Sequence, residues 1–199
     1  MNRRGMLIVI SGPSGVGKGT ILKHVFEKDK NLCYSVSSTT RQPRPGEVDG
    51  VNYNFISEQE FLDKIEKGQM LEYAMYCDNY YGTSLSFVNQ RLDSGVDVVL
   101  EIETLGAMQI KEKCPDSVLI FISPPTLDEL KSRLIGRATE SDEIIKMRIE
   151  KARFEMSNIR SYDYIVVNNI VEDAVNDILA ILYAERLKTI RNNFINEVF

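Results

Sequence analysis

The chain has 199 residues, of which 24 are Lys or Arg and 29 are Asp or Glu, so its formal net charge is −5. This acidic balance argues against a surface built to grip nucleic acid or an anionic membrane, and we expect neither as a partner. Hydrophobic residues make up 43% and charged residues 27% of the chain. Such a balance suits a packed core with a solvated exterior, and it excludes disordered, collagen-like and fibrous proteins.

Four short apolar runs rich in β-branched residues are spaced along the chain. They are Met6–Ile10, Val96–Ile102, Ser117–Ile122 and Tyr164–Val167. Near-continuous apolarity in such short segments is typical of strands buried on both faces, as in a parallel sheet. Helical patterns separate these runs, and longer amphipathic stretches cover Glu143–Arg160 and Glu172–Arg191. The alternation predicts an α/β fold of three layers around a mainly parallel central sheet.

A central stretch of the chain departs from this alternation. Cys33–Ser38 and Asn52–Ile56 are predicted to be strands, joined by a turn that contains two prolines. Ser57 with Glu60 three residues later is a capping-box pattern for a helix, which Gly68 can end. We interpret the region as a mixed α/β insertion on the main sheet rather than as an independent domain.

No targeting or membrane segment is expected. The run Met6–Ile10 is too short for an export signal, and no run approaches the roughly 20 apolar residues that cross a bilayer. The three cysteines lack the spacing of metal or redox sites, so they are predicted to be reduced thiols; they are Cys33, Cys77 and Cys114. We therefore expect a cytoplasmic protein. A single histidine, His24, leaves too few parts for a histidine-based triad or a zinc cluster.

The first predicted strand runs directly into a glycine-rich loop, Gly12-Pro13-Ser14-Gly15-Val16-Gly17-Lys18-Gly19-Thr20. It matches the phosphate-loop spacing Gly-x4-Gly-Lys. Glycines let successive backbone N–H groups point at phosphate oxygens, the following helix adds its positive end, and Lys18 adds a charge for the transferred phosphate. Gly19 stands where Ser or Thr usually contacts magnesium, so Thr20 or a water is the candidate for that contact. The alternative is an ordinary glycine-rich turn.

Several further motifs occur in order along most of the chain. They are Ser35–Glu47 with Gly50 and Tyr53-Asn54-Phe55, then Tyr80-Tyr81-Gly82-Thr83, Leu100-Glu101-Ile102, Gly106-Ala107 and Tyr164–Asn168. In this set the chain strongly resembles the guanylate kinase family. The resemblance implies a P-loop fold with a GMP-binding insertion and a short lid, and transfer of the γ-phosphate of ATP to GMP with magnesium as cofactor.

The resemblance also implies a role for particular residues. The GMP phosphate is expected to be held by Ser37, Arg41, Arg44, Tyr53 and Tyr81. The guanine is expected to be read by Glu72 and Thr83. Acidic positions near the acceptor and the metal match Glu101 and Glu103. Lid arginines match Arg133, Arg137 and Arg148, and a position near the adenine matches Asn168. The catalytic cations are then Lys18, Arg41, Arg137 and Arg148.

The chemistry of these side chains supports the same roles. Guanidinium groups bind a phosphate dianion bidentately. Guanine presents N1–H and N2–H₂ as adjacent donors, which one carboxylate can accept, whereas adenine would leave that carboxylate facing an acceptor. Phosphoryl transfer needs positioned positive charge rather than a protein nucleophile, so no residue is expected to become phosphorylated.

The resemblance implies one domain over residues 1–199, with a core of 1–32, 91–133 and 155–199, the insertion over 33–90 and the lid over 134–154. Some positions depart from the family pattern, namely Glu103, Leu105, Ala138 and Asn169. Two alternatives stay open: a scaffold that binds peptides without catalysis, and a kinase for another phosphorylated acceptor. The long C-terminal amphipathic stretch also leaves open whether the chain forms a homo-oligomer.

Overall fold

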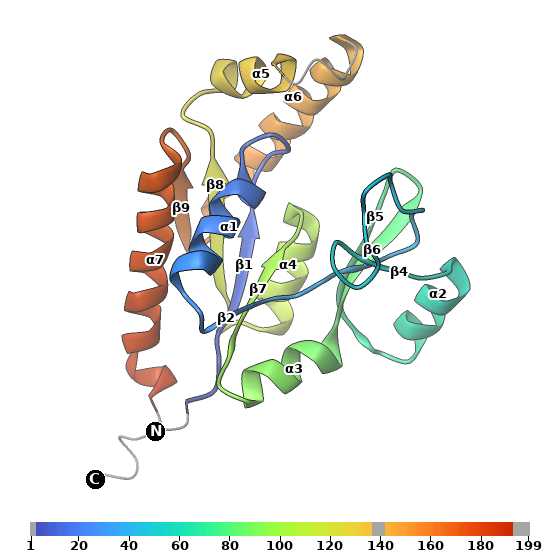
Figure 1. Cartoon of the computed structure of the whole chain (residues 1–199), viewed down its shortest axis with the longest axis vertical. Helices are drawn as coiled ribbons and strands as arrows, with labels where there is room; N and C mark the ends of the chain where they lie inside the picture. The colour runs from blue at the N-terminus through green and yellow to red at the C-terminus, as the bar shows by residue number, and fades with distance from the viewer. Residues whose placement is uncertain (1–2, 137–141, 193–199) are drawn as a thin grey trace.

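The computed structural model describes residues 3–136 and 142–192. At its centre lies a five-stranded sheet with the order β2-β7-β1-β8-β9, in which every neighbouring pair is parallel (Figure 1). Its strands are β1 (Leu7–Ser11), β2 (Leu32–Tyr34), β7 (Asp97–Glu101), β8 (Val118–Ser123) and β9 (Tyr164–Val167). All four predicted apolar runs are strands of this sheet, so the predicted α/β fold class is confirmed.

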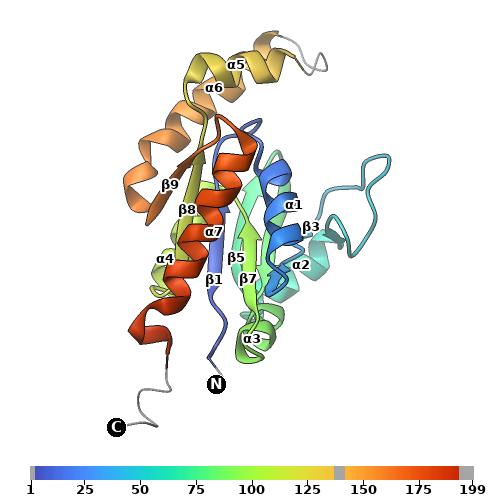
Figure 2. The same cartoon turned by 60° about the vertical axis from the view of Figure 1, so that its left-hand side comes forward.

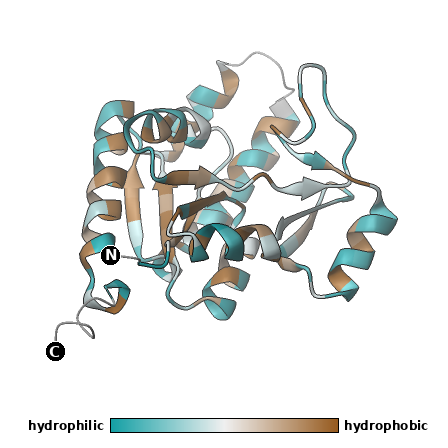
Figure 3. Ribbon diagram, turned by 60° about the horizontal axis from the view of Figure 1, so that its bottom comes forward, coloured by the Kyte–Doolittle hydropathy of each residue, from teal (hydrophilic) through white to brown (hydrophobic). Residues whose placement is uncertain are grey.

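Helices cover both faces of the parallel sheet because successive strand residues point to opposite sides. Ile8 and Ile10 of β1 belong to the core cluster that includes residues of α1 (Lys18–Lys28) and α7 (Val171–Leu187), which lie side by side in Figure 2. Leu7 and Val9 belong to the opposite cluster, with residues of α3 (Leu85–Asp93) and α4 (Thr104–Lys113). Figure 3 shows hydrophobic strands in this sheet and helices that carry both hydrophobic and hydrophilic residues.

A second sheet has four strands in the order β4-β3-β6-β5 and lies beside the first (Figure 1). Its strands are β3 (Ser38–Thr39), β4 (Asn54–Phe55), β5 (Met70–Tyr76) and β6 (Asn79–Ser84). The helix α2 (Glu58–Glu66) precedes β5, and the Ser57 hydroxyl accepts the Glu60 N–H at 3.2 Å as the capping pattern predicts. This mixed arrangement of strands and a helix is the one expected for the insertion.

One predicted element is wrong. The single strand expected over Cys33–Ser38 is two strands in two sheets: β2 pairs with β7 in the parallel sheet, whereas β3 pairs with β4 and β6. Ser35 still donates its N–H to the Val99 carbonyl at 3.0 Å, and the chain then leaves the edge of the parallel sheet. Residue 33, where the insertion was expected to begin, therefore lies in the central sheet.

Two helices form an arm at the carboxyl end of the parallel sheet (Figure 2). They are α5 (Leu127–Ile135) and α6 (Asp142–Ser157). Leu130 and Leu134 of α5 and Ile145 and Ala152 of α6 are buried in the same cluster as Ile8 and Ile10. Short 3₁₀ turns follow α6 and α7 at Ile159–Ser161 and Thr189–Arg191. No helix in the described ranges is long and apolar enough to span a bilayer.

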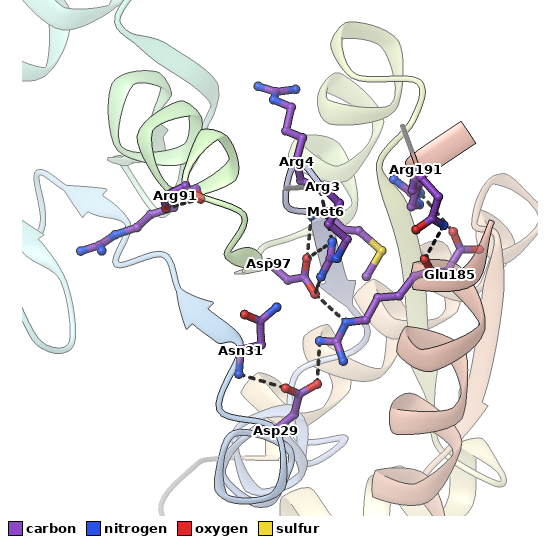
Figure 4. A network of polar contacts seen from close by, with 12 residues as sticks. Arg3, Arg4, Met6, Asp29, Asn31, Arg91, Asp97, Glu185 and Arg191 are labelled. Carbon is purple, nitrogen blue, oxygen red and sulfur yellow. Dashed lines mark hydrogen bonds and ion pairs between the residues drawn. The ribbon is translucent and has the colours of Figure 1, made fainter. Parts of the chain in front are cut away.

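A charged network closes the opposite, amino end of the sheet (Figure 4). The fully buried Asp97 carboxylate accepts hydrogen bonds from the Met6 N–H, from Arg3 and from Arg186, each at 2.8 Å. Arg186 also pairs with Asp29 at 2.6 Å. The network ties the segment before β1 to the start of β7 and to the end of α7.

Candidate active site

A pocket of about 390 Å³ opens at the carboxyl ends of β1 and β7, bounded by the second sheet and by α6. Loops at this edge of an open parallel sheet are the usual place for ligands in α/β folds. Most of the predicted site residues line it: Gly12, Ser14, Lys18, Ser37, Arg41, Arg44, Tyr53, Glu72, Tyr81, Glu101, Glu103 and Arg148. The fold thus brings together residues that are up to 136 positions apart in the sequence.

The phosphate loop connects β1 to α1. Gly12 has a φ of 148°, and a Cβ there would lie 2.2 Å from the Ile122 carbonyl oxygen, so only glycine fits. Val16 is fully buried and anchors the middle of the loop. Pro13, Gly15, Gly17, Gly19 and Thr20 complete the loop and the first turn of α1 without lining the pocket.

Lys18 is the first residue of α1, and its ammonium group lies inside this loop. Its Nζ donates to the Gly12 carbonyl at 2.6 Å and to the Pro13 carbonyl at 3.2 Å. Burial lowers the pKa of Lys18, and the charges of Glu101 and Glu155 act in the opposite direction. The cation is therefore held in place by neutral carbonyl oxygens, ready to exchange them for a more strongly charged acceptor.

The residues predicted to hold the acceptor phosphate come from neighbouring parts of the second sheet. Arg41 and Arg44 lie on the turn between β3 and β4, Ser37 and Tyr53 directly precede these two strands, and Tyr81 lies in β6. Arg41 lies over the Tyr53 ring, with its guanidinium carbon 5.4 Å from the ring centroid, and the Tyr53 and Tyr81 rings meet edge to face at 5.8 Å. Both terminal nitrogens of Arg41 contact the Glu47 carboxylate, at 2.9 and 3.0 Å. The hydrogen bond to Glu47 raises the pKa of Arg41, so this guanidinium stays charged and oriented.

A buried carboxylate, that of Glu72 in β5, lines the pocket. Glu72 is 3% exposed, and its Oε1 accepts the Thr83 hydroxyl at 2.6 Å. A Cβ on Gly106 would lie 2.5 Å from Glu72 Oε2, so α4 approaches this oxygen only because residue 106 is glycine. Burial raises the pKa of Glu72, with Thr83 and Lys113 acting against it. A buried acceptor with so little positive charge nearby is suited to a ligand that brings its own donors.

Three further predicted residues, Asn168, Arg133 and Arg148, contact the phosphate loop directly or through one another. The buried Asn168 donates to the Val16 carbonyl at 2.7 Å, and Arg133 donates to the Asn168 carbonyl at 3.0 Å. Neither residue lines the pocket, so their contact with ATP stays a prediction. Arg148 of α6 reaches the Ser14 hydroxyl at 3.4 Å. Arg137 lies outside the described residues.

Sequence reasoning missed several residues that line the pocket or hold its side chains. They are Tyr34, Asn52, Tyr76, Lys151 and Glu155 in the pocket wall, and Glu47 behind Arg41. Periodicity could have found some of them. Tyr76 follows Glu72 by four residues on one face of β5, and Lys151 follows Arg148 by three on one face of α6.

A phosphate loop at the carboxyl edge of a parallel sheet, facing arginines and a buried carboxylate across one pocket, defines a P-loop phosphotransferase with a phosphorylated acceptor. Comparison with known proteins narrows this class. The family model described as guanylate kinase matches residues 4–185. The chain belongs to the guanylate kinase family.

Individual relatives agree with this assignment over nearly the whole chain. The chain is similar to a guanylate kinase of Lactococcus lactis, with 55% identity over 191 residues that cover 96% of this chain and 93% of the relative. A guanylate kinase of Streptococcus pneumoniae is 56% identical over 93% of this chain and 89% of its own. The crystal structure of guanylate kinase from Anaplasma phagocytophilum superposes with a TM-score of 0.82 at 33% identity, covering 99% of this chain and 94% of that one.

Proposed function

We propose that this guanylate kinase transfers the γ-phosphate of ATP to GMP inside the pocket at the carboxyl ends of β1 and β7, giving ADP and GDP. One observation carries the assignment of both substrates to this pocket. The buried Glu72 carboxylate and the phosphate-loop Lys18 line the same cavity, with Arg41 and Arg44 also in its wall. The adjacent donors of a guanine base match the Glu72 carboxylate, and the phosphate of the same nucleotide matches Arg41 and Arg44. The triphosphate of ATP matches the phosphate loop.

For the acceptor, we assign the GMP phosphate to Arg41, Arg44, Tyr53, Tyr81 and Ser37. Arg41 is already fixed by Glu47 and by the Tyr53 ring, so little side-chain entropy is lost when phosphate binds. Glu72 accepts the guanine N1–H and N2–H₂, and the Thr83 hydroxyl keeps its carboxylate in one orientation. AMP offers no such pair of donors, so it leaves a buried carboxylate unpaired.

For the transfer itself, a GMP phosphate oxygen attacks the γ-phosphorus while the bond from that phosphorus to the bridging β–γ oxygen breaks. No protein nucleophile is needed. Lys18 and Arg148 supply positive charge from the loop and from α6, and Arg41 supplies it from the acceptor side. Arg137 is assigned to the same role from sequence, with Arg133 and Asn168 on the ATP side. The exclusion of water from the filled pocket suppresses ATP hydrolysis.

We assign magnesium as the cofactor, delivered with ATP. Among residues 3–136 and 142–192, no group of three His, Cys, Asp or Glu side chains is placed to hold a metal ion alone. Magnesium in kinases is held largely by phosphates and water and needs only one or two protein oxygens. Glu101 and Glu103 line the pocket and offer such oxygens, so these two residues fit the ion. Thr20 is exposed in the first turn of α1 but does not line the pocket, so its contact with magnesium, directly or through water, stays a prediction from the sequence. The ion supplies charge to the phosphates during transfer.

We also propose a division into a core of 1–34, 91–133 and 155–199, an insertion over 35–90 and a lid over 134–154. The first boundary, expected at residue 33, moves to the end of β2 because β2 pairs with β7 in the parallel sheet. Residues 137–141 of this lid lie outside the described residues. A cytoplasmic location and small-molecule partners rather than nucleic acid or membrane stay predictions from the sequence.

The proposal is tested by measuring ADP release from Mg-ATP with GMP, dGMP, AMP, CMP and UMP as acceptors. We expect turnover with GMP and at least 100-fold lower kcat/KM with AMP, because a buried unpaired carboxylate costs about 3 kcal/mol. Comparable rates with AMP and GMP would refute the role of Glu72, and absence of turnover with all five acceptors would refute the reaction.

A further inference from the structure

Lys151 of α6 has a position in the pocket that none of the roles above uses. Its Nζ contacts Glu103 Oε1 at 2.8 Å and lies 3.9 Å from the centroid of the Tyr76 ring. Glu155 Oε1 is 3.9 Å away. Lys151 and these three partners all line the same pocket. A lysine with a carboxylate on one side and an aromatic face on another is held by two kinds of attraction at once.

Lys151, Glu103 and Tyr76 belong to three separate structural elements. Lys151 belongs to α6, Glu103 is the residue immediately before α4 against the parallel sheet, and Tyr76 ends β5 in the second sheet. A single ammonium group therefore joins the helical arm, the central sheet layer and the insertion at the place where they meet around the pocket.

The same face of α6 carries Arg148 one turn earlier and Glu155 one turn later. Arg148 reaches the phosphate loop at Ser14. A contact that fixes Lys151 also fixes how this helical face lies over the pocket, because residues 148–155 belong to one continuous helix with regular geometry. The contacts of Lys151 thus bear on where the Arg148 guanidinium is placed.

Lys151 also balances charge beside Lys18. Glu103 and the largely buried Glu155 are both close to it, and burial raises the pKa of Glu155 while the charges of Lys151 and Lys18 lower it. Without Lys151, two carboxylates would face the pocket with less positive charge near the point where phosphates must gather. The more negative electrostatic potential in the pocket would disfavour a transition state that spreads negative charge over phosphate oxygens.

We propose that Lys151 is a positioning residue for phosphoryl transfer: by binding Glu103 and the Tyr76 ring it holds α6, with Arg148, over the pocket. The inference rests on the proposed function of the pocket and adds a residue to it. Because Lys151 contacts none of the groups assigned to the GMP phosphate or to guanine, its loss should act on kcat more than on KM for GMP.

The test compares the intact chain with Lys151→Met, which keeps the aliphatic stem and removes the charge, and with Lys151→Arg, which keeps the charge. Lys146→Met is the matched control, since Lys146 is exposed on the same helix and does not line the pocket. We expect Lys151→Met to lower kcat about 10-fold with KM for GMP and ATP within about 3-fold, and Lys151→Arg to recover most of the loss. Lys146→Met should match the unmodified chain.

A double-mutant cycle adds a readout for the proposed contact. Tyr76→Leu should lower kcat in the unmodified chain but cause little further loss in Lys151→Met, whereas Tyr76→Phe, which keeps the ring, should lose less than Tyr76→Leu. Unchanged kcat in Lys151→Met, equal losses in the Met and Arg variants, or additive losses in the cycle would each overturn the proposal.

Failure of the proposed function is recognised separately, because it would appear as absence of turnover in the unmodified chain. In that case hydrogen exchange decides the inference. Faster exchange of the amides of residues 70–76 and 148–155 in Lys151→Met than in Lys146→Met would support the contact, and equal exchange would refute it.

Discussion

The two ends of strand β7 carry carboxylates in opposite circumstances. Asp97 at its amino end is fully buried, and its oxygens accept from Arg3, Arg186 and a backbone N–H (Figure 4). Glu101 at its carboxyl end is half-buried and lines the pocket near Lys18. The five residues of β7 thus connect two charge clusters. In the closed cluster, around Asp97, the carboxylate is paired within the protein; in the open cluster, around Glu101 and Lys18, the charged groups line a cavity.

The direction of the pKa shifts separates the two clusters. At the closed end, burial raises the pKa of Asp97, but its hydrogen bonds from Arg3, Met6 and Arg186 outweigh burial and lower it. At the open end, burial prevails: it lowers the pKa of Lys18 and raises the pKa of Glu72 and of Glu155. Each of these three is pushed toward its neutral form because the protein supplies too little opposite charge. We infer that the open cluster is completed by its substrates.

Replacing Lys18 by Ala tests the open end most severely. We expect kcat to fall at least about 1,000-fold, because the cation proposed to bind the transferred phosphate is lost, while the melting temperature changes little. Steady-state kinetics and thermal unfolding measure the two effects. Lys23→Ala, at an exposed position of the same helix, is the control and should keep full activity. Near-normal turnover in Lys18→Ala would contradict the assignment of the loop.

Replacing Asp97 by Asn tests the closed end. We expect a loss of about 3 kcal/mol in the free energy of unfolding at neutral pH, because Arg3 and Arg186 lose their shared partner in a buried site. The matched control is Asp93→Asn, which breaks the exposed pair with Arg4 and should cost less than about 1 kcal/mol. Denaturant unfolding distinguishes them, and equal losses would contradict the proposed difference.

The pH dependence of that loss follows from the sign of the shift. The native pKa of Asp97 is below its ordinary value, so its stabilising contribution is complete above about pH 4 and disappears as the pH falls through the native pKa. The difference in unfolding free energy between the unmodified chain and Asp97→Asn should therefore shrink below about pH 4. A constant difference across that range would show that the ionised carboxylate is not what stabilises the fold.

Replacing Glu72 by Gln should affect binding and stability in opposite directions. We expect GMP binding to weaken about 30-fold while ATP binding stays within about 2-fold, since the proposed role of this side chain is to bind guanine and no part of ATP. A raised native pKa means that stability is lost as the pH rises through it, so the variant should be about 1 kcal/mol more stable at neutral pH. Calorimetric titration and unfolding measure these effects, with exposed Glu66→Gln as control. Equal weakening of both nucleotides would exclude a guanine-specific role.

Much of the fold could be predicted because it follows from local chemistry. Continuous apolar runs predicted the strands Leu7–Ser11 and Val118–Ser123 to within a residue or two, and the capping pattern predicted the start of α2 at Glu58. The break between β2 and β3 could not be predicted, because Cys33–Ser38 has one continuous strand-like pattern. Which sheet each half joins depends on the partners of Cys33 and Ser38, Val98 and Gly82, which are distant in sequence.

The site residues also fall into two groups: those that the sequence could predict and those that depend on tertiary packing. Lys18 and Arg41 belong to motifs whose spacing is readable, Glu72 was assigned through the family resemblance, and all three line the pocket. Lys151 and Glu155 belong to an amphipathic helix in which most charged residues are simply solvated, so their role depends on how α6 packs on the rest of the molecule. The sequence pattern alone does not predict how α6 packs there.

The smallest expected effect comes from Glu47, whose carboxylate binds both terminal nitrogens of Arg41 and accepts the Arg44 N–H at 2.7 Å. These bonds lower the pKa of Glu47, so it is ionised at neutral pH. Glu47 does not line the pocket, which places it behind Arg41 rather than in the phosphate position. We infer that it orders the arginine instead of competing with GMP.

Glu47→Gln should accordingly raise KM for GMP about 5-fold and leave KM for ATP and kcat nearly unchanged, because the amide loses the bidentate charged contact but keeps one acceptor. Exposed Glu58→Gln is the control in the same insertion. A lower KM for GMP in Glu47→Gln would mean that the carboxylate occupies the phosphate site and must leave it. In that event the acceptor end of the pocket, like the network around Asp97, would be closed by the protein itself until GMP arrives.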